Sequence, residues 1–365
     1  MRISGGHRPR APALRRRDAL ALGLAALALG WAARPLAAVA AGRFDLDRLK
    51  PGYLHRLRAI RAGGALPVID IESSYDPLRI DLAAFTKAMD GAGIAQMALS
   101  VDLPGKLAGA GESWSDHAHE LVARHPEYFI PCGNGGASPA WFNSPAAFVG
   151  ANERRIPAEG YPLMGEFEFR HYPSPRQVDR GEWGRDISIP LDGPEGRRLF
   201  AFAELSGVPF QIHYEVEDAL LPALEAMLAR YPRAKVIWCH MAQVRYAERA
   251  AKYGPAYLAG LFDRHANLYV DAAFGGPSSM YKPSGQRHAR VWDDSGKLRK
   301  DWRDLVESYP YRVMAALDIG GDRMDRVQDN ARTLRRFLDG LSPRAREIVA
   351  CKAAWKLLFG DDIAL

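Results

Sequence analysis

The sequence predicts an α/β protein with the fold of a (β/α)8 TIM barrel, and three observations support this prediction. Short apolar segments typical of buried parallel strands recur along the chain, and segments with helical periodicity separate most of them. About eight strand–helix units fit between residues 66 and 362, which is the usual size of such a barrel. Several of the apolar segments end in a polar residue, at the end where these barrels carry their active sites.

The expected strands are short and apolar, as buried parallel strands are. In chain order they span residues 66–71, 94–101, 128–133, 163–169, 208–212, 235–239, 267–274 and 312–317. Helices are expected at 81–93, 113–125, 193–206 and 219–230, with mixed helix and loop at 139–156 and a helix that ends at 250. Leu220, Leu224 and Leu228, for example, share one face at helical spacing. An open, doubly wound sheet is the alternative, but no glycine-rich phosphate loop follows the first strand.

Two segments lie outside these repeating units. Residues 42–65 form a mixed lead-in before the first strand, and residues 275–310 form a long polar insertion between the last two strands. At the carboxyl end of a barrel, such an insertion would lie over the pocket as a lid or a specificity loop. A solvated loop is an equally good interpretation of its composition.

Residues 1–41 are expected to be an export signal peptide of the twin-arginine type. Three arginines at 15–17 precede an apolar run over 19–33, and small residues follow at 38–41. The run is shorter than the roughly 20 apolar residues that span a membrane, which makes an uncleaved anchor the weaker alternative. The mature protein is therefore predicted to be periplasmic or secreted, with membrane contact only through this signal.

Charge and cysteine content exclude two further classes of function. The chain has 49 basic and 43 acidic residues, and the leader holds seven arginines and one aspartate, so 42 of each sign remain after cleavage. Because no basic excess remains, nucleic acid is not an expected partner. Cys132, Cys239 and Cys351 form no C-x-x-C pair, which predicts buried free thiols instead of a disulfide framework or a cysteine zinc site.

The polar residues that end the apolar segments are of the types that bind metal ions or transfer protons. Glu72 and Ser74 follow the first expected strand, and His213, His240 and Asp318 follow later ones. In a parallel barrel these strand ends meet at one rim, where histidine and carboxylate side chains can share an ion. A structural histidine, or an aspartate that caps a helix, is the alternative for each position taken alone.

Five segments of the chain resemble the amidohydrolase superfamily, in particular the branch similar to aminocarboxymuconate-semialdehyde decarboxylase. They are residues 68–74, 124–129, 207–213, 231–240 and 353–360, and the resemblance covers roughly residues 66–360. It implies a distorted barrel with one or two divalent metal ions. In such proteins the ligands are a histidine pair on strand one, a histidine after strand five and an aspartate after strand eight, and a histidine after strand six is a ligand or an acid/base.

Carried over to this chain, the resemblance implies that Glu72, His213 and Asp318 bind one divalent ion. His240 and Asp318 would be catalytic. The first strand departs from the pattern, because Glu72 and Ser74 stand where the histidine pair is usual. Glutamate can still supply an oxygen ligand, whereas serine is a weak one, so Zn²⁺, Mn²⁺ and Mg²⁺ all remain candidates.

Two residues of the fourth expected strand are further candidates. Glu168 could supply the ligand that is missing at strand one, or it could orient a ligand. Ser74 is likewise a possible ligand or a residue that orients one. Arg170 could bind a substrate carboxylate through paired hydrogen bonds. A solvated strand end explains Glu168 and Arg170 equally well.

These observations predict a metal-dependent hydrolase that acts on a small amide, ester or lactone through a metal-activated water. The Glu72-x-Ser74 pattern favours an alternative, a metal-dependent nonoxidative decarboxylase of an aromatic or unsaturated acid. A non-catalytic exported protein built on an enzyme barrel is the third hypothesis, because the first-strand motif is incomplete. The family resemblance also suggests a homodimer.

Overall fold

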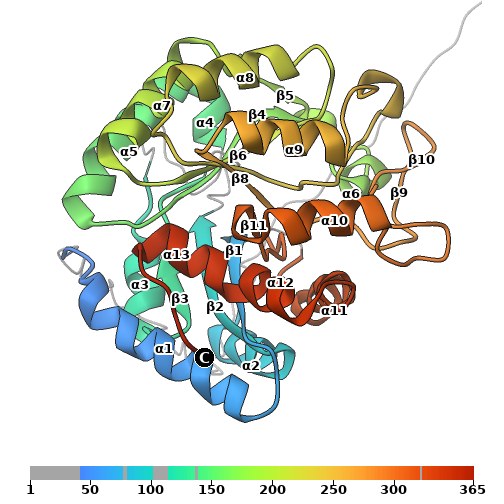
Figure 1. The fold of residues 1–365 in the computed structure, drawn as a ribbon. Coiled ribbons are helices and arrows are strands. Elements are labelled where there is room, and N and C mark those ends of the chain that lie inside the picture. Colours follow the sequence, from blue (N-terminus) through green and yellow to red (C-terminus); the bar gives the residue numbers. More distant parts are fainter. Residues whose placement is uncertain (1–41, 77–79, 102–113, 136–138, 321–322) are drawn as a thin grey trace, which may run out of the picture. The chain divides into compact units, whose positions relative to one another are not determined.

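The computed structural model describes residues 42–365 except 77–79, 102–113, 136–138 and 321–322 (Figure 1). The expected export signal, residues 1–41, lies outside the described residues. Among the helices that the structure describes, none combines the length and the apolar character needed to cross a membrane.

All eight predicted strands are present, and neighbouring strands run parallel. They are β1 (Val68–Tyr75), β2 (Ile94–Val101), β3 (Phe129–Pro131), β4 (Met164–His171), β6 (Phe210–Tyr214), β7 (Val236–Trp238), β8 (Leu268–Asp271) and β11 (Val313–Met314). One sheet has the order β1-β2-β3, and a second has the order β11-β8-β7-β6-β4-β5, with β5 (Ile187–Ser188) antiparallel to β4. A small hairpin, β9 (Met280–Tyr281) and β10 (Gln286–Arg287), lies within the predicted insertion.

Backbone hydrogen bonds join these two sheets at both junctions. Between β3 and β4, the Gly133 N–H donates to the Leu163 carbonyl at 2.9 Å. Between β1 and the segment that follows β11, Ile71 donates to Ala315 at 3.1 Å and Asp318 donates to Glu72 at 3.1 Å. The eight parallel strands therefore form a closed (β/α)8 barrel, although regular ladder pairing is interrupted at the two junctions.

Helices cover the outside of the barrel (Figure 1). They are α1 (Leu46–Ala62), α2 (Leu82–Ala92), α3 (His117–Arg124), α4 (Pro139–Asn143), α5 (Pro145–Glu159), α6 (Pro175–Asp179), α7 (Pro194–Ser206), α8 (Leu221–Arg230), α9 (Pro255–Arg264), α10 (Lys300–Ser308), α11 (Val327–Asp339), α12 (Pro343–Glu347) and α13 (Ala353–Phe359). Strand β4 illustrates how the two faces differ. Phe167 packs against Trp141 of the helical layer at a ring distance of 5.4 Å. Its neighbours Glu166 and Glu168 have the opposite parity and face the barrel interior.

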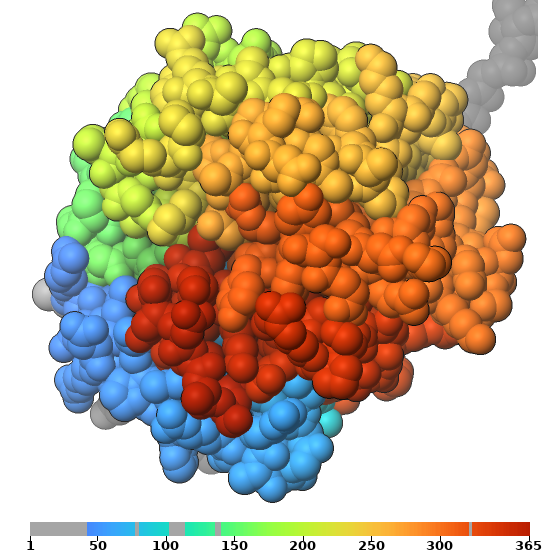
Figure 2. Space-filling model, viewed as in Figure 1, coloured from blue at the N-terminus to red at the C-terminus, as the bar shows by residue number. Residues whose placement is uncertain are grey.

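The lead-in at 42–65 is mostly helical, because α1 occupies Leu46–Ala62. Only Tyr53 and Leu57 of this helix are buried, so its apolar stripe is too narrow to stand out in the sequence. Helix α1 packs against the C-terminal segment, where the rings of Tyr53 and Phe359 are 6.1 Å apart. In Figure 2 red C-terminal residues lie against blue N-terminal ones on the face shown.

The helix expected to end at residue 250 is only a three-residue 3-10 turn at Ala247–Arg249. Asp218 holds the chain in this tighter path. Its carboxylate accepts hydrogen bonds from the backbone N–H groups of Ala251 (3.1 Å) and Lys252 (3.0 Å). Donors captured by a side chain are not available to a continuing helix.

Asp70 links β1 to the segment after β11, and its loss should destabilise the barrel. Its carboxylate accepts from the N–H groups of Glu72 (3.2 Å) and Leu317 (3.0 Å) and from the Ser73 hydroxyl (2.6 Å), all buried. Asp70→Ala should lower the free energy of unfolding by about 3 kcal/mol or more, because it leaves three buried donors without an acceptor. Denaturant unfolding measures this change. Asp70→Asn is the matched control: it keeps one acceptor oxygen and should cost less, and equal losses in both variants would contradict the prediction.

Candidate metal centre

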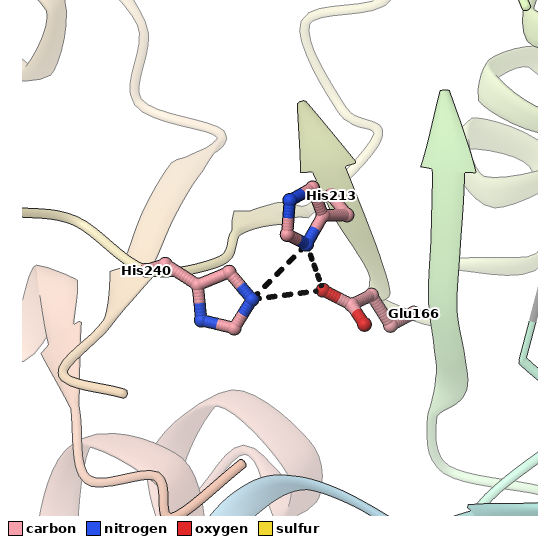
Figure 3. Close-up of side chains that lie close together, drawn as sticks. All are labelled: Glu166, His213 and His240. Atoms are coloured by element: carbon pink, nitrogen blue, oxygen red, sulfur yellow. Dashed lines mark hydrogen bonds and ion pairs between the residues drawn. The ribbon is translucent and has the colours of Figure 1, made fainter. Parts of the chain in front are cut away.

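Three side chains from neighbouring strands converge inside the barrel, as Figure 3 shows. Glu166 comes from β4, His213 from β6, and His240 from the loop directly after β7. Glu166 Oε1 is 3.0 Å from His213 Nδ1 and 3.2 Å from His240 Nε2, and the two imidazole nitrogens are 3.1 Å apart. An ion with ligand bonds of about 2.0–2.2 Å has adjacent ligand atoms at about this spacing, so the triangle could hold one.

A second group of possible ligands shares His240 with the first. Glu72 of β1 and Asp271 at the end of β8 each offer a carboxylate oxygen within 4.8 Å of the other and of the imidazole. Glu72 Oε2 and Asp271 Oδ2 are buried, and no hydrogen-bond donor among the described residues reaches either atom. Unsatisfied buried carboxylate oxygens are costly, and a cation would satisfy both.

Hydrogen bonds outside the cluster fix the orientation of its imidazoles. His240 Nδ1 lies 2.8 Å from the Ala273 carbonyl, so Nδ1 carries the proton and Nε2 is left to bind an ion. His213 Nε2 lies 3.1 Å from Glu215, whose carboxylate also contacts Arg245 Nε at 2.8 Å. Burial opposes ionisation of Glu215, but Arg245 and His213 outweigh it and lower the pKa of this carboxyl to about 2.

The charges inside the cluster shift its pKa values in opposite directions. Although burial acts against both changes, the contact between Glu166 and His213 raises the pKa of His213 to about 10 and lowers the pKa of Glu166 well below its usual value. For Glu72, burial and then the nearby Asp318 and Glu166 carboxylates raise the pKa well above its usual value. The cluster thus concentrates negative charge that needs protons or a metal ion for balance.

Two non-glycine residues of the described chain have a left-handed backbone, and both lie at this rim. His240 has φ 64° and Asp318 has φ 49°. This region costs free energy for residues other than glycine, and such residues concentrate at functional sites. The strain therefore supports a functional interpretation of the strand ends.

The other sequence-predicted residues lie in different surroundings. Asp318 forms a double ion pair with Arg323, at 2.6 Å for each carboxylate oxygen, although its charge still acts on Glu72 and His240. Ser74 donates its backbone N–H to Ile319 at 2.6 Å, at the β1–β11 junction.

The two candidates on β4 are both ion-paired at the rim. Glu168 pairs with Arg185 and is 3.7 Å from His171. Arg170 pairs with Asp186 at 2.5 Å and covers the Tyr172 ring at 3.7 Å.

Two members of the cluster, Glu166 and Asp271, are not among the site residues predicted from the sequence. Glu166 shares one strand face with Glu168 and Arg170, and this parity was visible in the sequence. Asp271 is a single carboxylate within the apolar segment 267–274 and has no partner with recognisable spacing. The three cysteines are free and buried, as predicted.

A cavity of about 290 Å³ opens beside the cluster, at the carboxyl ends of the strands. Its walls include Arg245 after β7, Ala273 after β8 and Asp318 after β11, together with Ser279 and His288 of the insertion. The insertion is bonded to the loop after β7, since Val244 N–H donates to the His288 carbonyl at 2.8 Å. Part of the insertion therefore forms a wall of the cavity.

Comparisons with known proteins are consistent with this fold. The model of the amidohydrolase family matches residues 107–325. A solved amidohydrolase II structure is 14% identical, covers 80% of this chain and 99% of its own, and has a TM-score of 0.50. A 2,6-dihydroxybenzoate decarboxylase from Rhizobium is 14% identical over 80% and 98% of the two chains, with a TM-score of 0.48. No curated protein sequence matches.

A third solved structure is a dihydroxybenzoic acid decarboxylase from Polaromonas with bound manganese and the inhibitor 2-nitroresorcinol. It is 13% identical over 80% of this chain and 96% of its own, with a TM-score of 0.46. At 14% identity and a TM-score of 0.50, the amidohydrolase II structure bears on the fold alone.

Proposed function

This chain belongs to the amidohydrolase family, and on that premise we propose that it is a metal-dependent hydrolase of a small amide, ester or lactone. The observation that carries the proposal is the buried cluster around His240. It combines a ligand triangle with sides of 3.0–3.2 Å and two buried carboxylate oxygens that lack donors. It lies at the rim where barrel enzymes carry their sites, next to a cavity large enough for a small molecule.

The residues around the cluster divide the work between ion binding and proton transfer. Glu72, His213 and His240 would hold the ion together with a further carboxylate. When bound, the ion supplies the Lewis acidity that activates a water and polarises a carbonyl group. Asp318, which lines the cavity, is placed to accept or deliver a proton at the substrate side. Arg323 contacts both carboxylate oxygens of Asp318 and so fixes the orientation of this side chain at the cavity.

A metal-dependent decarboxylase is the second candidate function, and the charges at the cavity favour it. Arg176, Arg245, Arg323 and Arg326 line the cavity, against Asp318 and Asp329. Although Arg245 also pairs with Glu215, the guanidinium groups at the cavity can bind a substrate that carries a carboxylate. Glu72 and Ser74 in place of a histidine pair point the same way, as the sequence analysis noted.

Metal analysis and product detection test both candidates. The purified mature protein should contain a divalent metal ion and turn over a member of a panel of amides, esters, lactones and hydroxybenzoates. Acid release identifies the hydrolase, and CO₂ release identifies the decarboxylase. Protein without bound metal, whose melting temperature does not respond to added Zn²⁺, Mn²⁺ or Mg²⁺, would favour the non-catalytic alternative and rule out both enzymes.

The affinity for the metal ion should fall as the pH falls. The pKa values of Glu72, His213 and His240 all lie above their ordinary values, so each group keeps its proton to a higher pH than usual and the proton competes with the ion. For each proton that binding releases, the affinity for the ion falls about tenfold when the pH falls by one unit. Titration calorimetry between pH 6 and 9, in buffers of different ionisation enthalpy, gives both the affinity and the number of protons released. A dissociation constant independent of pH would contradict the shifts.

We also propose that the protein acts after export, since residues 1–41 have the layout of a twin-arginine signal. Mass spectrometry of the intact protein from a host with the twin-arginine system tests this directly. Removal of the leader supports a periplasmic or secreted location. An intact N-terminus in the cytoplasmic fraction contradicts it.

A further inference from the structure

We infer that Asp271, at the end of β8, binds the divalent ion together with Glu72 and His240, in the role that family resemblance gives to Asp318. The inference rests on the proposed function, because it requires that the site binds a metal ion. It replaces Asp318 by Asp271 as a ligand, and it places His213 beside the ion instead of in its ligand set.

Asp318 is already fully engaged with another charge. Arg323 contacts both of its carboxylate oxygens at 2.6 Å in a paired arrangement, one of the strong ion-pair geometries. The side chain of Asp318 is 32% exposed, whereas Asp271 is 0% exposed. To bind the ion, Asp318 would have to exchange this ion pair for the metal. Asp271 has no such partner to lose.

The Asp271 carboxylate is already held in position, with one oxygen unused. Oδ1 accepts from the N–H groups of His240 at 2.9 Å and of Ala273 at 3.0 Å. Oδ2 is buried, and no donor among the described residues hydrogen-bonds to it. The thiol of Cys239 lies close enough to influence the pKa of Asp271, but it does not reach Oδ2 in hydrogen-bond geometry.

The same short segment also orients the nitrogen ligand. The Ala273 carbonyl binds His240 Nδ1 at 2.8 Å, while Asp271 holds the His240 backbone in its left-handed conformation. Residues 271–273 thereby set the positions of both Asp271 Oδ2 and His240 Nε2. Groups that are fixed in this way lose little entropy when an ion binds.

Glu72 completes the set from the opposite side of the β1–β11 junction. Its Oε2 atom, like Asp271 Oδ2, is buried and has no hydrogen-bond donor among the described residues, and each of the three residues offers a ligand atom within 4.8 Å of the other two. Two carboxylates and one imidazole form a donor set that suits Mn²⁺ or Zn²⁺. Because His240 Nε2 can bind only one ion, the Glu166–His213 pair would then lie beside the ion as a charged neighbour.

Matched asparagine variants separate the two aspartates. Asp271→Asn keeps the Oδ1 acceptor for both backbone donors, and Asp318→Asn makes the same chemical change at the other candidate. We expect Asp271→Asn to weaken Mn²⁺ binding roughly 100-fold or more. Loss of a residue that only hydrogen-bonds to a metal ligand already lowers metal affinity by about 10–100-fold. Asp318→Asn should bind Mn²⁺ within a few-fold of wild type. Titration of each variant with Mn²⁺, in which electron paramagnetic resonance detects the free ion, measures both affinities.

Cobalt loading of cysteine variants detects the ligand directly, even if Asp271→Asn folds poorly. In Asp271→Cys, bound Co²⁺ should show a thiolate-to-cobalt charge-transfer band. The band should be absent from cobalt-loaded wild type, which is the control for the nearby thiol of Cys239. Asp318→Cys should not show it. The band in Asp318→Cys alone, or loss of Mn²⁺ binding in Asp318→Asn alone, would overturn the inference. Wild type that binds neither ion would instead refute the proposed function.

Discussion

Stripping the divalent ion from the purified protein should abolish turnover and lower its melting temperature by ~5 °C or more. An ion present at 100 times its dissociation constant stabilises the folded state by about 2.7 kcal/mol. For a domain of this size, each kcal/mol corresponds to a few degrees. Without the ion, one buried oxygen of Glu72 and one of Asp271 also remain without a hydrogen-bond donor among the described residues. Differential scanning calorimetry before chelation, after it, and after reloading measures the change.

Glu72→Gln connects this effect to the site. The variant keeps the size of the side chain but removes the charge, so the metal-dependent shift in melting temperature should largely disappear. Glu225→Gln is the matched control, because Glu225 lies on α8 and pairs with Tyr257 and Arg264 outside the barrel. It should keep the full shift. If Glu72→Gln responded to metal as wild type does, Glu72 would not be a ligand.

The strands could be predicted because their signal is local. Each is a short apolar segment between polar ones, and burial on both faces of a parallel strand imposes that composition. The position of His213 and His240 at strand ends follows from the same signal, and the structure brings both to one cluster. Helix α1 could not be recognised in this way, since only two of its 17 residues are buried.

The composition of the cluster depends on geometry between distant segments. Asp271 and Glu72 are about 200 positions apart, and their relation arises only when the barrel closes between β1 and β11. Asp318 pairs with Arg323 and has a left-handed backbone, and no sequence pattern indicates either feature. Strand-end position therefore identifies candidates, while the choice among carboxylates needs the orientation of each side chain.

His240→Asn should lower kcat/KM by about 1,000-fold on whichever panel substrate is turned over. His240 Nε2 lies within reach of Glu166 and His213 and within 4.8 Å of oxygens from Glu72 and Asp271, so its loss affects every arrangement of ligands. A lost ligand or proton-transfer group typically costs 10²–10⁴-fold. Asparagine tolerates the left-handed backbone at φ 64°, so the loop should keep its path.

His265→Asn is the matched control, because it removes a buried imidazole outside the cluster. His265 is also buried, but it ends helix α9 at the amino end of β8, away from the carboxyl-end rim. Its replacement should leave kcat/KM within a few-fold of wild type, whatever its effect on stability. Metal content measured alongside the kinetics separates two causes in His240→Asn. Lost metal identifies His240 as a ligand, and retained metal with the same loss of rate identifies it as the acid/base. Full activity in His240→Asn would show that His240 is neither a ligand nor the acid/base. The two ligand groups would then lose the residue that they share.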